Sequence, residues 1–185
     1  FGADAVLDTY YAAFRWPDLR VTLRVVGALA AGFIPIFTEA FHGGDAGHPA
    51  AWQLVNNVLQ SILLASGAGA LLMLALVEPI TRLLTPGFSS SAQRETADLT
   101  RIMLLSPLFL GVSAVLGGVL QSLKQFFVFS LAPVLYNAGI IAGALFLVPR
   151  LGSRGLAWGV VLGAALHLLI QLPATVSAGY RFRWG

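Results

Sequence analysis

Residues 52 to 77 limit the possible folds of this chain more than any other stretch, because these twenty-six consecutive positions carry no charge. A helix needs about 20 predominantly apolar residues to cross the hydrocarbon core of a bilayer, so this run is long enough to span with some tilt. Trp52 stands at one end of the run, and Glu78 and Arg82 follow the other end. The pattern predicts a transmembrane helix near residues 50–83.

The composition places the whole chain in the same class. Hydrophobic residues make up 57% of the 185 residues and charged residues 10%, with a mean hydropathy of +0.82. A soluble domain carries about 25% charged residues. The chain has no cysteine and three scattered histidines, which argues against a metal cluster, and its net charge of +3 is too small to indicate nucleic-acid binding. The composition predicts an integral membrane protein.

Four more apolar stretches are separated by short polar connections. Pro86 and Gly87 form a turn pair followed by serines that can cap a helix, and Lys124 marks a second tight reversal. Short connections favour antiparallel neighbours, so we predict an all-α polytopic transmembrane helix bundle of about five spans. Residues 1–185 are expected to form a single transmembrane domain. The expected helices lie near residues 5–41, 50–83, 91–123, 126–148 and 153–180.

The stretch from 8 to 35 is the functional candidate, because it is strongly apolar and yet carries Arg15, Arg20 and Arg24. An ionisable side chain at membrane depth costs at least about 2.5–3.5 kcal/mol, so it usually faces a wet cavity or a partner. The other interpretation is an interfacial helix whose arginines reach lipid headgroups. Pro17 removes a backbone hydrogen bond, and the helix is expected to bend or break there.

The spacing of the arginines divides them into two groups. At about 100° per residue, Arg20 and Arg24 lie about 40° apart around a helix, whereas Arg15 lies about 140° from Arg20. A straight helix therefore presents two arginines on one face. A bend at Pro17 can bring Arg15 back towards that face.

Other polar residues within the apolar runs have a simpler explanation. We expect Asn137, and His167 with Gln171 one turn later, to bond to neighbouring helices, and a proton relay through His167 is the alternative. The sequence shows no nucleophile and base pairing, metal cluster or phosphate-cradling loop, so we expect that the chain is not an enzyme. Transport is favoured over catalysis, and a non-transporting membrane scaffold stays open.

Five segments carry a resemblance to a known family. They are, in order, FGADAVLDTYYAAFRWPDL, GALAAGFIPIFTE, TPGF, APVLYNAGIIAGALFLVP and LAWGVVLGAALHLLIQLP. In this order and at these spacings they resemble the MurJ/MviN family of bacterial lipid II flippases, in the multidrug/oligosaccharidyl-lipid/polysaccharide exporter superfamily. The resemblance covers nearly the whole chain. Its most specific parts are the FGA-x(4)-D-x(5)-F-[RK]-x-P start and the G-A-x(4)-F-[IV]-P segment.

The resemblance implies a fragment that corresponds to helices two to six of an N-terminal six-helix lobe, without the first helix and the C-terminal lobe. The implied function is translocation of lipid II, an undecaprenyl-diphosphate-linked muropeptide, through an arginine-lined cavity by alternating access. The implied location is the bacterial inner (plasma) membrane, and the implied partners are lipid II, membrane lipids and the remainder of the transporter. No cofactor is expected in the fragment. A coupling cation or the membrane potential would act through a site outside it.

The resemblance also assigns residues, with one departure. Asp8 matches an acidic cavity position of the family, and Arg15 matches its basic position before the proline. The family's arginine and glutamate positions are occupied here by Val21 and Val26. Either nearby arginines replace the lost charge, or the chain is a divergent exporter of the same superfamily, for polysaccharide-lipids or for drugs by cation coupling. The implied substrate-binding residues are Arg24, Arg20, Arg15 and Asp8.

Overall fold

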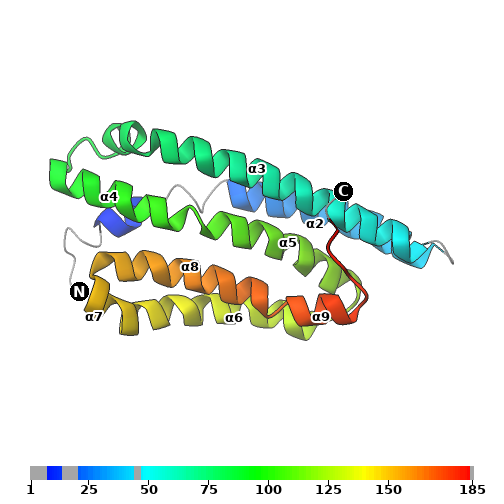
Figure 1. Ribbon diagram of the computed structural model, residues 1–185. Helices are drawn as coiled ribbons and strands as arrows, with labels where there is room; N and C mark the ends of the chain where they lie inside the picture. The colour runs from blue at the N-terminus through cyan, green and yellow to red at the C-terminus, as the bar shows by residue number, and fades with distance from the viewer. Residues whose placement is uncertain (1–7, 14–20, 44–46, 184–185) are drawn as a thin grey trace.

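The computed structural model describes residues 8–13, 21–43 and 47–183, and for residues 21–31 it describes the backbone alone. Throughout these residues the regular structure is helical and contains no strand, which confirms the predicted all-α bundle (Figure 1). Residues 8–13 form a short helical segment. The elements that follow are α2 (Val21–His42), α3 (Gly47–Leu84), α4 (Ser90–Met103), α5 (Ser106–Ser122), α6 (Phe126–Ala142), the π-helical turn η1 (Gly143–Leu147), α7 (Val148–Leu151), α8 (Ser153–Leu169) and α9 (Leu172–Ser177).

Four helical stretches within the described residues are long and apolar enough to cross a membrane. They are His48–Leu84, Ser90–Ser122, Phe126–Leu151 and Ser153–Ser177, with mean hydropathies from 1.8 to 2.1. The chain is therefore a multi-pass membrane protein. The remaining expected helix, near residues 5–41, includes residues 14–20, so the bend predicted at Pro17 lies outside the described residues.

Two of the spans are interrupted close to a proline. The helical path divides at Leu104 and Leu105 between α4 and α5, and Pro107 lies in the first turn of α5. The path divides again between α8 and α9, and Pro173 lies in the first turn of α9. Proline lacks an N–H and suits the first turn of a helix, so each break falls just before it. Both paths continue in the same direction across the break (Figure 1).

The connections between spans are short and have identifiable turn chemistry. The predicted Pro-Gly turn is closed by the Phe88 N–H, which donates to the Thr85 carbonyl at 3.1 Å. The Ser89 side chain accepts from the Ala92 N–H at 3.2 Å and caps α4, as the sequence predicted. Lys124 adopts a positive φ of 58° between α5 and α6, which lets the chain reverse at once.

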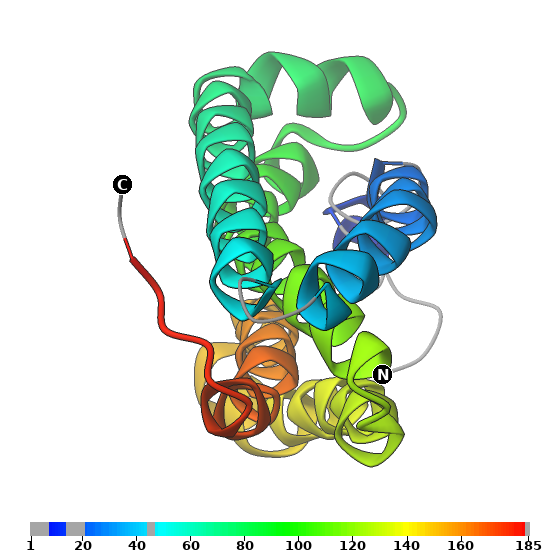
Figure 2. The same ribbon diagram turned by 90° about the vertical axis from the view of Figure 1, so that its right-hand side faces the viewer.

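The helices form two layers (Figure 2). One layer contains the path formed by α4 and α5, with α2 and α3 on either side of it, and the other layer contains α6, α8 and α9. α5 also contacts the second layer. Phe37 of α2, Val55 of α3 and Val119 of α5 are completely buried in one core cluster. Between α6 and α8 the backbones themselves touch, because Gly139 faces Gly163 with no side chain between them.

Candidate functional site

The candidate site begins with the helical segment 8–13. Ala13 at its end is completely buried and packs with Leu99 and Met103 of α4 and with Ala157 of α8. Asp8, which the family resemblance assigned to the site, is exposed at the start of this segment. The segment is therefore anchored to α4 and α8 by its apolar end, while its acidic end is exposed.

The arginines of the candidate site follow this anchor. Arg15 and Arg20 lie outside the described residues, and Arg24 lies in the first turn of α2, where the structure describes the backbone alone. The structure therefore does not test whether these side chains and Asp8 converge on one cavity. That convergence stays a prediction.

The rest of α2 is fixed by aromatic packing. Phe33 is buried against α5 at Gly118, where an added Cβ would lie 3.1 Å from the Phe33 ring. Phe37 stacks between Phe33 and Phe41, with ring centroids 5.7 and 5.5 Å away. Arg24 precedes Phe33 by nine residues, which is about 14 Å along a helix. The backbone that carries Arg24 is thus continuous with a helix that is locked onto α5.

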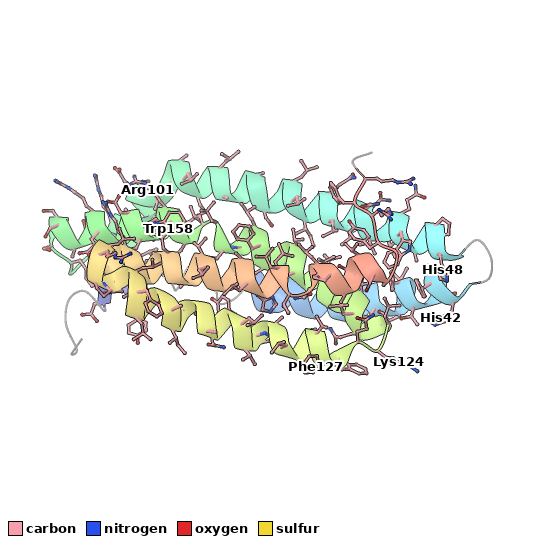
Figure 3. All side chains as sticks on the ribbon, turned by 60° about the horizontal axis from the view of Figure 1, so that its bottom comes forward. His42, His48, Arg101, Lys124, Phe127 and Trp158 are labelled. Atoms are coloured by element: carbon pink, nitrogen blue, oxygen red, sulfur yellow. The ribbon has the colours of Figure 1, made fainter. Side chains whose placement is uncertain are left out.

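A charged network at the end of the bundle was not predicted from the sequence. Arg101 donates to Glu78 of α3 at 2.9 Å and to Asp98 of α4 at 2.8 Å, and Arg154 of α8 reaches Asp98 at 3.2 Å. These ion pairs tie α3, α4 and α8 together. The i, i+3 spacing of Asp98 and Arg101 was the visible signal. Arg101 lies at the opposite end of the bundle from His48 and Lys124 (Figure 3).

This network borders a surface hollow of about 390 Å³. The hollow lies between α4 and the turn that joins α7 to α8, and the Ser153 hydroxyl donates to the Glu95 carboxylate at its wall. Its lining combines acidic and basic side chains that already bind one another. Its residues are Glu95, Asp98, Leu99, Leu151, Gly152, Ser153 and Arg154.

A buried polar cluster joins α5 to the break between α8 and α9. The Ser113 hydroxyl lies 2.5 Å from His167 Nδ1, and Gln171 Nε2 donates to Ser113 Oγ at 2.6 Å and to the His167 carbonyl at 3.1 Å. In a continuous helix the Gln171 N–H would donate to the His167 carbonyl, but here it donates to the Leu168 carbonyl. The Gln171 side chain donates to the His167 carbonyl in its place. His167 is thus satisfied on a neighbouring helix, as expected. Within the part of the chain that the structure describes, Gln171 Oε1 is buried without a hydrogen-bond partner.

Two other polar side chains in the spans are Asn137, which was expected to bond to a neighbouring helix, and Asn56. The Asn137 amide donates to the Pro133 carbonyl of its own helix at 2.8 Å rather than to a neighbouring helix, because it lies on an exposed face of α6. Asn56 on α3 is buried and accepts from the Tyr180 hydroxyl at 2.9 Å.

Over residues 8–13, 21–43 and 47–183, no group of three His, Cys, Asp or Glu side chains could hold a metal ion.

Comparison with known proteins gives a consistent result. The family model for lipid II flippase MurJ matches residues 1–184. The lipid II flippase MurJ of Burkholderia cenocepacia is 33% identical over 177 residues, which cover 94% of this chain and 34% of that protein. The probable lipid II flippases MurJ of Bdellovibrio bacteriovorus and Vibrio cholerae are 33% and 30% identical, and the matches cover 95% and 100% of this chain and 34% and 37% of theirs. The chain spans about a third of the length of these relatives. Because the family model covers almost every residue, the chain belongs to the lipid II flippase MurJ family.

Proposed function

We propose that this chain is part of a flippase that moves lipid II across the bacterial inner membrane. The observation that carries the proposal is the match of the lipid II flippase MurJ family model to residues 1–184, in a chain with four membrane-crossing helical stretches among its described residues. The partners under this proposal are lipid II, membrane lipids and the remainder of the transporter. The family is one of transporters, so the proposed activity breaks no covalent bond.

The chemistry of the cargo explains why arginines are needed. The diphosphate of lipid II cannot enter hydrocarbon by itself, whereas its polyprenyl tail can stay in the lipid. A guanidinium group holds phosphate oxygens in bidentate fashion and keeps its charge at any physiological pH. We assign Arg24 and Arg20 as the principal diphosphate ligands, because Val21 occupies the family's arginine position. Arg15 and Asp8 have supporting roles in this proposal.

The anchors on either side of the arginines support this assignment. Ala13 is buried against α4 and α8, and Phe33 is buried against α5. A charged stretch held at both ends can present its side chains at a constant position, which favours binding because less ordering is needed. Alternating access would then move this bundle against the rest of the transporter as one unit. The proposal includes no cofactor in this chain, and it assigns the coupling cation or the membrane potential to a site elsewhere.

Complementation in cells depleted of their own lipid II flippase tests the proposal. The full-length protein should restore growth, and Arg24→Ala or Arg20→Ala should abolish or strongly reduce rescue at matched membrane abundance. Arg15→Ala should reduce it less. Arg150→Ala, in the exposed turn at α7, is the matched control and should rescue fully. Failure of the unmutated protein would refute the proposed cargo, and full rescue by the Arg20/Arg24 double alanine would refute the assigned ligands.

A further inference from the structure

The chain that leaves α9 does not continue as a helix but crosses to α3. Residues 180–183 have no regular secondary structure, and they pass from the end of α9 to the side of α3 (Figures 1 and 2). Gly179 precedes them with a φ of +101°, a conformation that glycine adopts without strain. An added Cβ at Gly179 would lie 3.6 Å from the indole nitrogen of Trp52 on α3.

Tyr180 fixes the first point of this crossing. Its side chain is 5% exposed, and its ring lies 5.7 Å from the Trp52 ring, between centroids. The Tyr180 hydroxyl donates to Asn56 Oδ1 at 2.9 Å across 124 positions of sequence. Asn56 is itself buried, so this hydrogen bond joins two buried side chains.

Arg183 fixes the second point through its backbone. Its N–H donates to Asn56 Oδ1 at 3.3 Å, and its carbonyl accepts from Gln60 Nε2 at 2.9 Å. Asn56 and Gln60 are one helical turn apart on α3, so they present an acceptor and a donor along one line. These contacts are what an adjacent strand would offer to an extended chain.

We propose that Asn56 and Gln60 form a backbone-binding site on α3 that holds residues 180–183 as a strap between α9 and α3. The strap adds α3 to the partners of α9, which packs chiefly on α5 and α8. Because Arg183 is held by its main chain, the site should tolerate any side chain there and should reject proline, which has no N–H. Any segment that follows the strap would then start from the side of α3. The proposal does not depend on the identity of the transported molecule.

Limited proteolysis of the full-length protein in detergent tests the strap directly. Trypsin can cleave after Arg181, which is exposed, but a protease must first pull the strand into its own active site. When opening is fast, the cleavage rate follows the population of the open form. The Asn56→Leu/Gln60→Leu double variant should be cut after Arg181 about tenfold faster or more, because the bonds to Tyr180 and Arg183 are lost. Fragment masses identify the cut.

Two controls separate the strap from general loosening. Asn57→Leu makes the same chemical change at an exposed position of α3 beside the site and should leave the rate unchanged. Cleavage after Lys124, in the turn at the same end of the bundle, reports the stability of the helices and should not rise in the double variant. Arg183→Ala should leave cleavage after Arg181 slow, whereas Arg183→Pro should accelerate it.

Each outcome of the proteolysis experiment either supports or overturns the strap. Selective acceleration after Arg181 in the double variant and in Arg183→Pro would support the strap. Equal rates in the double variant and the unmutated protein would overturn it. Equal acceleration after Arg181 and Lys124 would also overturn it, because the substitutions would then have loosened the bundle as a whole.

Discussion

The contact between α6 and α8 gives the sharpest prediction of stability. A Cβ added at Gly139 would lie 2.5 Å from the backbone nitrogen of Gly163. An ordinary van der Waals contact starts at 3.4 Å, so Gly139→Ala forces the two backbones apart by about 0.9 Å. Backbone atoms cannot rotate away as a side chain can. Overpacking of a core costs about 1–3 kcal/mol, and we expect the upper end of that range.

Gly69→Ala on α3 is the matched control, because an added Cβ there meets nothing within 4 Å. In a domain of this size about 1 kcal/mol shifts the melting temperature by about 2–4 °C. Gly139→Ala should therefore lower the melting temperature of the protein in detergent by about 6–12 °C, and Gly69→Ala should leave it unchanged or raise it slightly. Equal melting temperatures for the two variants would refute the argument from backbone contact.

Three further predictions concern polar side chains. Ser113→Ala should destabilise the protein by about 1–3 kcal/mol, because the Ser113 hydroxyl is hydrogen-bonded to both His167 and Gln171. Gln171→Leu should destabilise it less, because this substitution also removes the unpaired Oε1 atom. Chemical unfolding measures the free energy of unfolding of both variants. Burial raises the pKa of Tyr180 from 10.0 to about 12, so the neutral phenol stabilises the fold below pH 10 and this contribution is lost as the pH rises towards 12. Tyr180→Phe should flatten that alkaline loss in melting curves. Arg101→Met should cost less than about 1 kcal/mol, since the ion pairs are half-exposed, and a cost above about 2 kcal/mol would contradict this.

Much of the architecture could be predicted because it depends on local features of the sequence. The uncharged run from 52 to 77 lies within α3, which has the length that a membrane requires. Helix breaks fall just before prolines, as at Pro107 and Pro173. Close helix contacts fall at glycines: Gly118 receives Phe33, and an added Cβ at Gly111 would lie 2.9 Å from a side chain of α3. Each of these features depends on residues that are close together in the sequence, or on the small size of one residue.

The polar contacts could not be predicted, because their partners are far apart in the chain. Ser113 and His167 are separated by 54 positions, and Asn56 and Arg183 by 127. The sequence shows which side chains can donate or accept, but many helix packings would satisfy them equally well. The polar side chains of α3 illustrate this, because the structure pairs Asn56 and Gln60 with an irregular segment after α9.

The packing of α2 bears on how the proposed transport would take place. Phe33 and Phe37 are buried among α3 and α5, and Gly118 leaves no space for α2 to slide across α5 without displacing the Phe33 ring. The segment before the arginines is tied separately to α4 and α8 through Ala13. The strap from α9 to α3 joins further helices to the same unit. Packed cores resist continuous deformation, so under the proposed function a diphosphate held by Arg24 would change its exposure to the two sides of the membrane through rotation of the whole bundle. A spin label on α2 and another on α5 should therefore keep one separation throughout the cycle, and two separations that exchange on adding cargo would contradict the rigid unit.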